Sequence, residues 1–372
     1  MVLAGLALCD KVVDEYTLRR LLDIDIDAVE IQLENWDSFG MYFRQGMALP
    51  DFLDDRVLAS QDTLLAQALM KIKSKRFKSF HGPTNLGNLS SLDEAVREQA
   101  MEVTLHSMDV AQALGTDIFV LHPCKFDWNY WERFRPKVNN YMEFRLRTED
   151  VFIENLKRLC EYYSRKGFTF RVGIENLEFN QLPSTVDEIR RIIERSREVW
   201  NAGELGLVLD IQHLKHSKAI LKENLPNPIG SVVSQEELAR LERYAHTAVC
   251  REHDYSPPEG ESMPVINGLF RSMIDDIILI HLGGNNHRHA THDPILYDLR
   301  TFNYDGGHYT AGVLNLRQVL DIVHNSGYNG AIILEVKSDQ ELIGRKFEEC
   351  VKSFENVRDY LAYLEGGDAH SS

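Results

Sequence analysis

The sequence of 372 residues predicts an α/β fold, a closed (β/α)8 barrel, from three observations. Short apolar or β-branched runs alternate with helical patterns along the chain, eight such runs can be distinguished, and no GxGxxG turn follows the first run. Alternating strands and helices are typical of a parallel sheet. Eight regular units without a dinucleotide-binding turn favour a closed barrel over an open, doubly wound sheet.

In chain order, the predicted strands are Leu3–Leu8, Ala28–Leu33, Phe77–His81, Asp117–His122, Thr169–Glu175, Leu205–Asp210, Ile277–His281 and Ala331–Glu335. In the segments between them apolar residues recur every three or four positions, as in LDEAVREQAMEVTLHSMDVAQALG, whose final Gly115 suits a helix C-cap. Each strand is therefore followed by a helix.

Two connections are longer than a plain strand–helix unit requires. An aromatic and locally basic insertion at about 125–150 follows the fourth strand, and an insertion at about 214–273, with NLPNPIG and SPPEGESMP, follows the sixth. Each could be a lid, a substrate wall, an oligomer contact or a solvated loop. We expect one barrel domain over residues 1–365 and a disordered tail at 366–372.

Composition limits the kinds of molecule that this protein is expected to bind. The chain is 44% apolar and 26% charged, as in ordinary globular proteins, and carries a formal net charge of −16. This excess of acid disfavours a large nucleic-acid footprint, which needs Lys and Arg, although one basic patch can sit on an acidic protein. The five cysteines lack a CxxC pattern, and neither a signal peptide nor a membrane-spanning run is present. We expect a cytoplasmic protein with a small-molecule substrate and no membrane partner, and the oligomeric state stays open.

Metal-competent side chains end the predicted strands from the third onward. They are His81, His122, Glu175, Asp210, His281 and Glu335. The carboxyl ends of barrel strands meet at one mouth, where converging like charges would repel unless a cation held them. Each residue taken singly could be a hydrogen-bonded structural residue, but the joint pattern predicts a divalent metal site.

Further candidates lie beside this set. His213 follows Asp210 by three residues, and Asp305 and His308 lie in NYDGGHYTAG, a loop after the seventh strand that can approach the same mouth. Candidate substrate contacts are His213, Trp128, Trp131, Arg288 and Lys337. The tryptophans could instead pack under a loop, and the two basic side chains could simply be solvated.

Six motifs carry a resemblance to a known family. They are FHGPTNLGNLSSLDEAVREQA, ALGTDIFVLHPC, IENLE, LGLVLDIQH, ILIHLGG and IILEV, in this order over most of the chain. Together they resemble the xylose-isomerase-like TIM-barrel superfamily, which contains sugar isomerases, tagatose-epimerase-type enzymes and endonuclease IV. The motifs are specific for the superfamily and separate its members poorly.

The epimerase branch implies a one-ion site. By this resemblance one divalent ion is held by Glu175, Asp210, His281 and Glu335. Glu175 and Glu335 then stand on opposite sides of a bound sugar as proton-transferring carboxylates, and His213 contacts substrate hydroxyls. Where that branch usually carries an Arg six residues after its metal His, this chain has His287, with Arg288 beside it.

Endonuclease IV implies a larger cluster. By that resemblance His81 and His122 join Glu175 on one zinc, the four residues of the one-ion site surround a second, and His213 and His308 serve a third. Asp305 and His308 are three residues apart, whereas that enzyme has the pair two apart.

The sequence thus predicts a metal-dependent sugar or sugar-phosphate isomerase or epimerase, with Glu175 and Glu335 as the catalytic pair. One alternative is an endonuclease IV-like phosphodiesterase acting at abasic sites. The other is a barrel that binds metal or ligand without turnover, which the intact carboxylate pair disfavours. Carboxylates favour hard ions and histidines favour zinc, so the cofactor is Zn, Mn, Co or Mg, in one to three ions.

Overall fold

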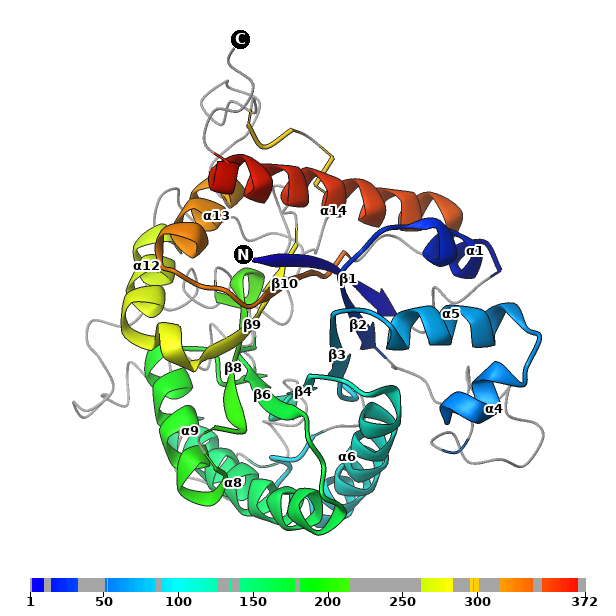
Figure 1. Cartoon of the computed structure of the whole chain (residues 1–372). Coiled ribbons are helices and arrows are strands. Elements are labelled where there is room, and N and C mark those ends of the chain that lie inside the picture. The colour runs from blue at the N-terminus through cyan, green and yellow to red at the C-terminus, as the bar shows by residue number, and fades with distance from the viewer. Residues whose placement is uncertain are drawn as a thin grey trace.

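The computed structural model confirms the closed barrel of eight parallel strands, with helices around it (Figure 1). It describes residues 2–9, 15–32, 51, 53–84, 88–125, 134, 141–177, 181–201, 203–214, 262–283, 295–296, 298–300, 315–336 and 343–366. The barrel strands are β1 (Leu3–Cys9), β2 (Ala28–Gln32), β3 (Phe77–His81), β4 (Ile118–Leu121), β6 (Arg171–Glu175), β8 (Leu205–Asp210), β9 (Ile277–Leu282) and β10 (Ala331–Leu334). They pair in the order β1-β10-β9-β8-β6-β4-β3-β2, and β2 pairs with β1 to close the barrel.

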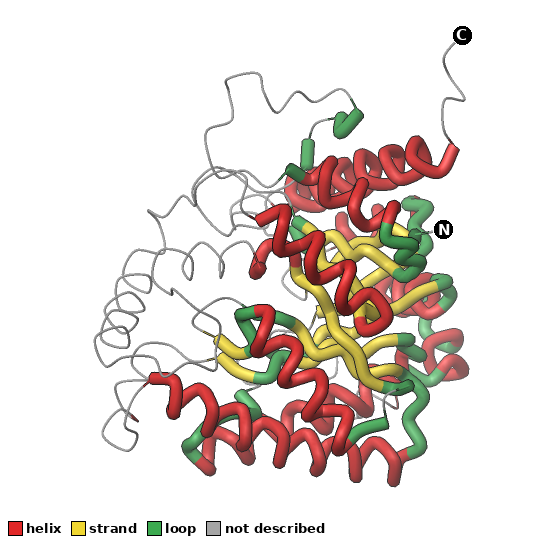
Figure 2. The backbone as a smooth tube through the Cα atoms, turned by 90° about the vertical axis from the view of Figure 1, so that its left-hand side faces the viewer, coloured by secondary structure: helices red, strands yellow, loops and turns green. Residues whose placement is uncertain are grey.

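Helices enclose these strands, as Figure 2 shows from the side. They are α1 (Glu15–Asp23), α4 (Asp55–Ala59), α5 (Leu64–Lys73), α6 (Glu94–Leu114), α8 (Tyr141–Lys166), α9 (Val186–Val199), α12 (Ser262–Met273), α13 (Leu316–Asn325) and α14 (Ile343–Gly366). Local sequence sets several ends. Asp93 caps α6 by accepting a hydrogen bond from the Ala95 N–H, and Gly115 ends that helix at a φ of 67°, as its sequence predicts. None of the described helices is long and apolar enough to cross a membrane.

The two predicted insertions overlap barrel helices. Residues 141–150 form the start of α8, and Ser262–Met273 forms α12. In the sequence, the aromatic and charged residues around Tyr141 resemble a loop. In the structure they begin α8, and Phe144 and Phe152 on this helix are fully buried. Most of the rest of both insertions lies outside the described residues, as do residues 367–372 of the predicted tail. One short antiparallel pair, β5 (Cys124–Lys125) with β7 (Gln181–Leu182), was not predicted from the sequence.

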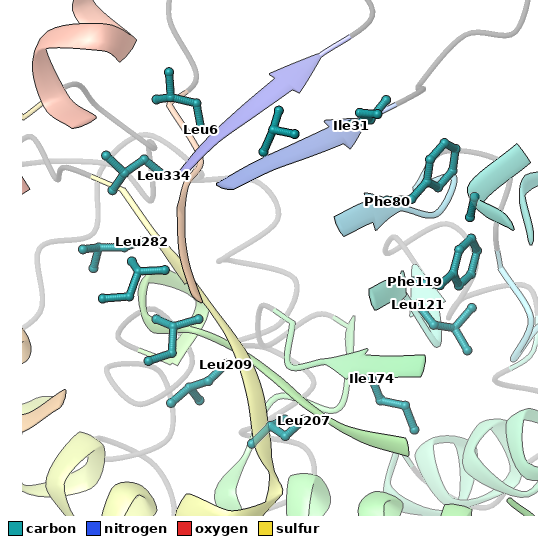
Figure 3. Close-up of a cluster of buried hydrophobic side chains, with 14 of the residues drawn as sticks. Leu6, Ile31, Phe80, Phe119, Leu121, Ile174, Leu207, Leu209, Leu282 and Leu334 are labelled. Atoms are coloured by element: carbon teal, nitrogen blue, oxygen red, sulfur yellow. The ribbon is translucent and has the colours of Figure 1, made fainter. Parts of the chain in front are cut away.

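The two-residue alternation of each strand separates two cores. One set of side chains points away from the barrel centre toward the helices (Figure 3) and includes Leu6, Ile31, Phe80, Phe119, Ile174, Leu207 and Leu334. The other set fills the barrel and includes Ala28, Val208 and Ile333. Toward the mouth of the barrel, the residues of this second, inward-pointing set are polar.

Glycines let large side chains close the barrel interior. A Cβ at Gly173 would lie 2.3 Å from Val208 Cγ2, and one at Gly206 would lie 2.4 Å from Ile278 Cγ2. Alternating small and large residues therefore fill the space beneath the mouth. Polar groups above this apolar floor are shielded from water on one side, which strengthens their electrostatic interactions.

Candidate metal centre

Four barrel strands bring acidic and histidine side chains to the mouth. Glu175 and Asp210 are the last residues of β6 and β8, His281 lies in β9, and Glu335 directly follows β10. Asp210 is in register with His281, and the Glu335 N–H donates to the Leu282 carbonyl oxygen at 3.0 Å. These four side chains are buried, with exposed fractions of 5% or less. The predicted convergence at the mouth is therefore observed.

The ligand atoms of these four residues lie within 4.8 Å of one another. His281 Nδ1 is 3.4 Å from Glu175 Oε1 and 3.5 Å from Glu335 Oε1. Within the described part of the chain, Glu175 Oε1, Asp210 Oδ2 and His281 Nδ1 are buried without a hydrogen-bond partner. Such atoms cost about 1–3 kcal/mol each when left unsatisfied. A divalent cation would satisfy all three, so this donor set fits one, and we call it the first donor set.

A second donor set surrounds the other oxygen of Glu175. Glu175 Oε2 lies 3.2 Å from His81 Nε2 and 2.7 Å from His122 Nε2. The His81 Nδ1–H donates to the Gly82 carbonyl oxygen at 2.8 Å, which directs Nε2 to Glu175. Ligand atoms of His81, His122 and Glu175 also fall within 4.8 Å of one another. Glu175 therefore belongs to both donor sets, one oxygen to each.

Asn176 holds Asp210 and His213 in place through hydrogen bonds. Its side chain donates to the Asp210 carbonyl oxygen at 2.9 Å and accepts from the Asp210 N–H at 2.8 Å. The His213 N–H donates to Asp210 Oδ1 at 2.8 Å, and His213 Nδ1–H donates to the Asn176 carbonyl oxygen at 2.9 Å. Asp210 Oδ1 is thus occupied, and Oδ2 faces the first donor set. His213 reaches the mouth as predicted, with Nδ1 3.5 Å from Glu175 Oε1.

A family model, described as the xylose isomerase-like TIM barrel, matches residues 18–360. The chain belongs to this family. No curated protein sequence matches it at a significant level.

Solved structures show the same fold. A D-tagatose 3-epimerase-like protein gives a TM-score of 0.58 at 17% identity, covering 99% of this chain and 100% of that one. A 3-keto-D-glucoside 4-epimerase from E. coli gives 0.53 at 14%, covering 98% and 100%. The IOLI protein with a bound zinc atom gives 0.54 at 12%, covering 98% and 99%. At these identities the similarity shows the fold alone.

The buried ionisable side chains of this xylose isomerase-like barrel shift one another's pKa values. Burial raises the pKa of Asp210 to about 6, with the Glu175 and Glu335 charges adding to it against that of His213. Burial alone would lower the pKa of His81, but the hydrogen bond and charge of Glu175 raise it to about 9. The His281 pKa is likewise raised well above its usual value, against burial, by surrounding carboxylates. Protons on His81 and His281 therefore balance the carboxylates, and a metal ion has to displace them.

Burial acts in opposite directions on the pKa values of His122 and Glu175. Burial lowers the pKa of His122, despite the opposing charge of Glu175. Burial would raise the pKa of Glu175, but the charges of His122 and His281 lower it well below its usual value. Glu175 is therefore ionised and ready to bind a cation at neutral pH.

Glu30 was not predicted as a site residue from the sequence. Glu30 in β2 is fully buried, accepts a hydrogen bond from Ser79 Oγ at 2.9 Å, and lies 3.0 Å from His281 Nε2. Its ligand atoms also group with those of His81, His281 and Glu335. Glu30 stands two residues before the end of its strand, so a search of strand ends passes over it. A glutamate inside the apolar run AVEIQ is the signal that could have revealed it.

Other predicted site residues lie outside the described residues. They are Trp128, Trp131, Arg288, His308 and Lys337, together with Asp305 and His287. Their assignment to substrate contacts or to a third metal site stays a prediction.

Proposed function

We propose that this protein is a metal-dependent isomerase or epimerase acting on a sugar or sugar phosphate. One observation carries the proposal. Two buried carboxylates from β6 and β10, Glu175 and Glu335, each present Oε1 within 3.5 Å of His281 Nδ1. Two acid/base groups therefore flank one point at which a divalent ion fits. The epimerase names of several proteins with this fold agree with the proposal.

The chemistry uses both properties of the first donor set. A divalent ion held by Glu175, Asp210, His281 and Glu335 would polarise the oxygens of a bound ketose and acidify the adjacent C–H. One of the two catalytic glutamates removes the carbon-bound proton while its electron pair moves toward the carbonyl oxygen. The opposite glutamate then delivers a proton to the carbon, which inverts its configuration. We assign His213, which Asn176 orients, to the substrate hydroxyls.

The floor of the barrel supports this reaction class. Apolar side chains such as Val208 and Ile333 fill the space beneath the mouth. A site with a dry floor keeps proton transfer between carboxylate and carbon away from bulk water. The net charge of −16 also favours a small ligand over an extended polyanion.

Proton exchange tests the proposal directly. Purified protein with Mn²⁺, Co²⁺, Zn²⁺ or Mg²⁺ is incubated in D2O with ketoses and ketose phosphates, and NMR follows deuterium at the carbon beside the carbonyl. We expect metal-dependent exchange on at least one sugar. Glu175→Gln and Glu335→Gln should each lower it by about 10²-fold or more. Glu98→Gln, in an exposed pair with Arg158, is the matched control and should leave the rate unchanged.

The second donor set favours one other candidate function. Two ions sharing Glu175, the second held by His81 and His122, could clamp the attacking and leaving oxygens of a phosphodiester. Incubation with a duplex that contains one abasic site tests this function. Metal-dependent cleavage, with no exchange on any sugar, would replace the isomerase proposal by a phosphodiesterase.

A further inference from the structure

A carboxylate in the barrel interior needs partners, and those of Glu30 include Ser79 and His281. Its strand alternates between outward residues, Val29 and Ile31, and inward ones, so Glu30 points into the barrel. It is in register with Ser79 on β3, whose hydroxyl donates to Glu30 Oε2 at 2.9 Å. The same oxygen lies 3.0 Å from His281 Nε2 on β9. Glu30 is therefore held in place and directed to one ring nitrogen.

The two ring nitrogens of His281 face different groups. Nε2 faces Glu30, while Nδ1 faces Glu175 and Glu335 at 3.4 and 3.5 Å. A neutral imidazole carries one N–H and one lone pair. With Nε2–H donated to Glu30, the lone pair is on Nδ1, inside the first donor set. A ring flip would place carbon atoms at both positions and lose both contacts.

We propose that Glu30 is a positioning residue, which fixes the ring orientation and tautomer of His281 for metal binding through Nδ1. The inference rests on the proposed function only in requiring a metal ion at the first donor set. A carboxylate that accepts the second N–H of a metal-bound histidine raises the basicity of the ligand and locks its ring. Glu30 is in this relation to His281, with strands β1 and β10 between β2 and β9 in the barrel.

The rival role for Glu30 is that of a ligand. Its oxygen could join His81, His281 and Glu335 around a cation. If the ion bound His281 Nε2 in this set, Nδ1, buried between two carboxylates, would carry the proton. Glu30 Oε2 already accepts the Ser79 hydroxyl and lies within hydrogen-bond distance of Nε2. The positioning role keeps both contacts, so the geometry favours it.

Two substitutions in the full-length protein remove the properties of the Glu30 carboxylate in steps. Glu30→Gln keeps an oxygen that accepts from Nε2–H but removes the charge, and Glu30→Leu removes the acceptor. Zinc affinity, measured by chelator competition, should fall about tenfold in the first and about a hundredfold in the second, with the zinc count unchanged. Glu149→Gln is the matched control, because Glu149 is equally buried but pairs with Arg191 and Arg195 in the helix layer.

Spectroscopy separates positioning from a general structural effect. In zinc-loaded protein with ¹⁵N-labelled histidine, His281 is assigned as the signal missing in His281→Gln. We expect its Nε2 proton to be shifted downfield by Glu30, to move upfield in Glu30→Gln, and to exchange rapidly in Glu30→Leu. If Glu30→Leu does not fold, the Gln variant still decides through affinity and the same proton.

Three results would overturn the positioning role. They are the loss of one zinc ion in Glu30→Gln, an unchanged affinity and Nε2 signal, or an equal fall in affinity in Glu149→Gln. Absence of sugar turnover in the wild type would refute the proposed function, but the zinc affinities and the His281 signal would still decide the role of Glu30.

Discussion

Asp210→Asn should stabilise the metal-free protein and should lose most of this advantage when metal binds. In the metal-free protein the pKa of Asp210 is raised by burial to about 6, from 3.8. A carboxyl with a raised pKa costs stability at pH values above it, and the cost vanishes as pH falls below the unfolded value. At 1.36 kcal/mol per unit, ionised Asp210 costs about 3 kcal/mol at pH 8. Asn has no charge to bury, so the metal-free variant should be the more stable.

With metal the stabilities of the two proteins should become nearly equal. An ion present at 1,000 times its dissociation constant stabilises the fold by about 4 kcal/mol. Unfolding 372 residues releases about 0.8 kcal/mol/K of entropy, so this ion raises Tm by about 5 °C. A hundredfold weaker ion in Asp210→Asn would contribute about 2.7 kcal/mol less and raise Tm by only about 2 °C. The variant should therefore gain about 3 °C less from zinc than the wild type.

Thermal unfolding measures both effects. The Tm of each protein is recorded with chelator and with excess zinc, at pH 8 and at pH 4.5, where the metal-free advantage of the variant should shrink. Asp150→Asn, an exposed residue paired with Arg195, is the control and should change neither quantity. The reasoning is refuted if metal-free Asp210→Asn is less stable than the wild type at pH 8, or if zinc raises both Tm values equally.

Three further outcomes are expected. Elemental analysis after dialysis should give more than one zinc per chain, and the count should fall to one when His81 and His122 are both replaced by Ala. Glu175→Gln should lower the zinc occupancy of both donor sets, because each set uses one oxygen of Glu175. Arg145→Met should destabilise the fold by about 3–5 kcal/mol in urea at pH 7, because it leaves Glu188 buried without its guanidinium. The pKa of Glu188 is lowered by Arg145 against burial, so this stabilisation holds above the unfolded pKa of about 4.3, and the difference should shrink in acid. Zinc binding should release protons, seen by calorimetry in buffers of different ionisation enthalpy, and a release of zero would contradict the protonated histidines of the metal-free site.

Site residues could be predicted from the sequence where position along a strand decides position in space. Strand ends of a parallel barrel meet at one mouth, so the end positions of His81, Glu175 and Asp210 were enough to bring them together. The spacing of three residues from Asp210 to His213 likewise placed His213 beside Glu175. Neither result depends on the details of packing.

Site residues whose partners are distant in the sequence could not be predicted from it. The importance of Glu30 depends on His281, which is 251 residues away, and only the closed barrel places them together. Asn176 follows Glu175 as an ordinary amide, and its role depends on the backbone of Asp210 across the β6–β8 pair. The start of α8 was missed because its aromatic residues resemble a loop until Phe144 is seen in the core.

The order in which ions bind bears on the choice between the two reaction classes. Among the described residues, Asp210 Oδ2, His281 Nδ1 and Glu175 Oε1 are buried without hydrogen-bond partners, so an ion that displaces the His281 proton breaks no hydrogen bond at these three atoms. An ion at the second donor set has to break the contacts of His81 and His122 with Glu175 Oε2, at 3.2 and 2.7 Å. The first ion should therefore bind more tightly, and a one-ion form should dominate at low metal concentration. That form already contains both proton-transferring carboxylates, whereas a two-ion phosphodiesterase is complete only after the weaker ion binds. Activity measured across a zinc titration should consequently saturate with the first equivalent, and saturation only with the second would favour phosphodiester hydrolysis.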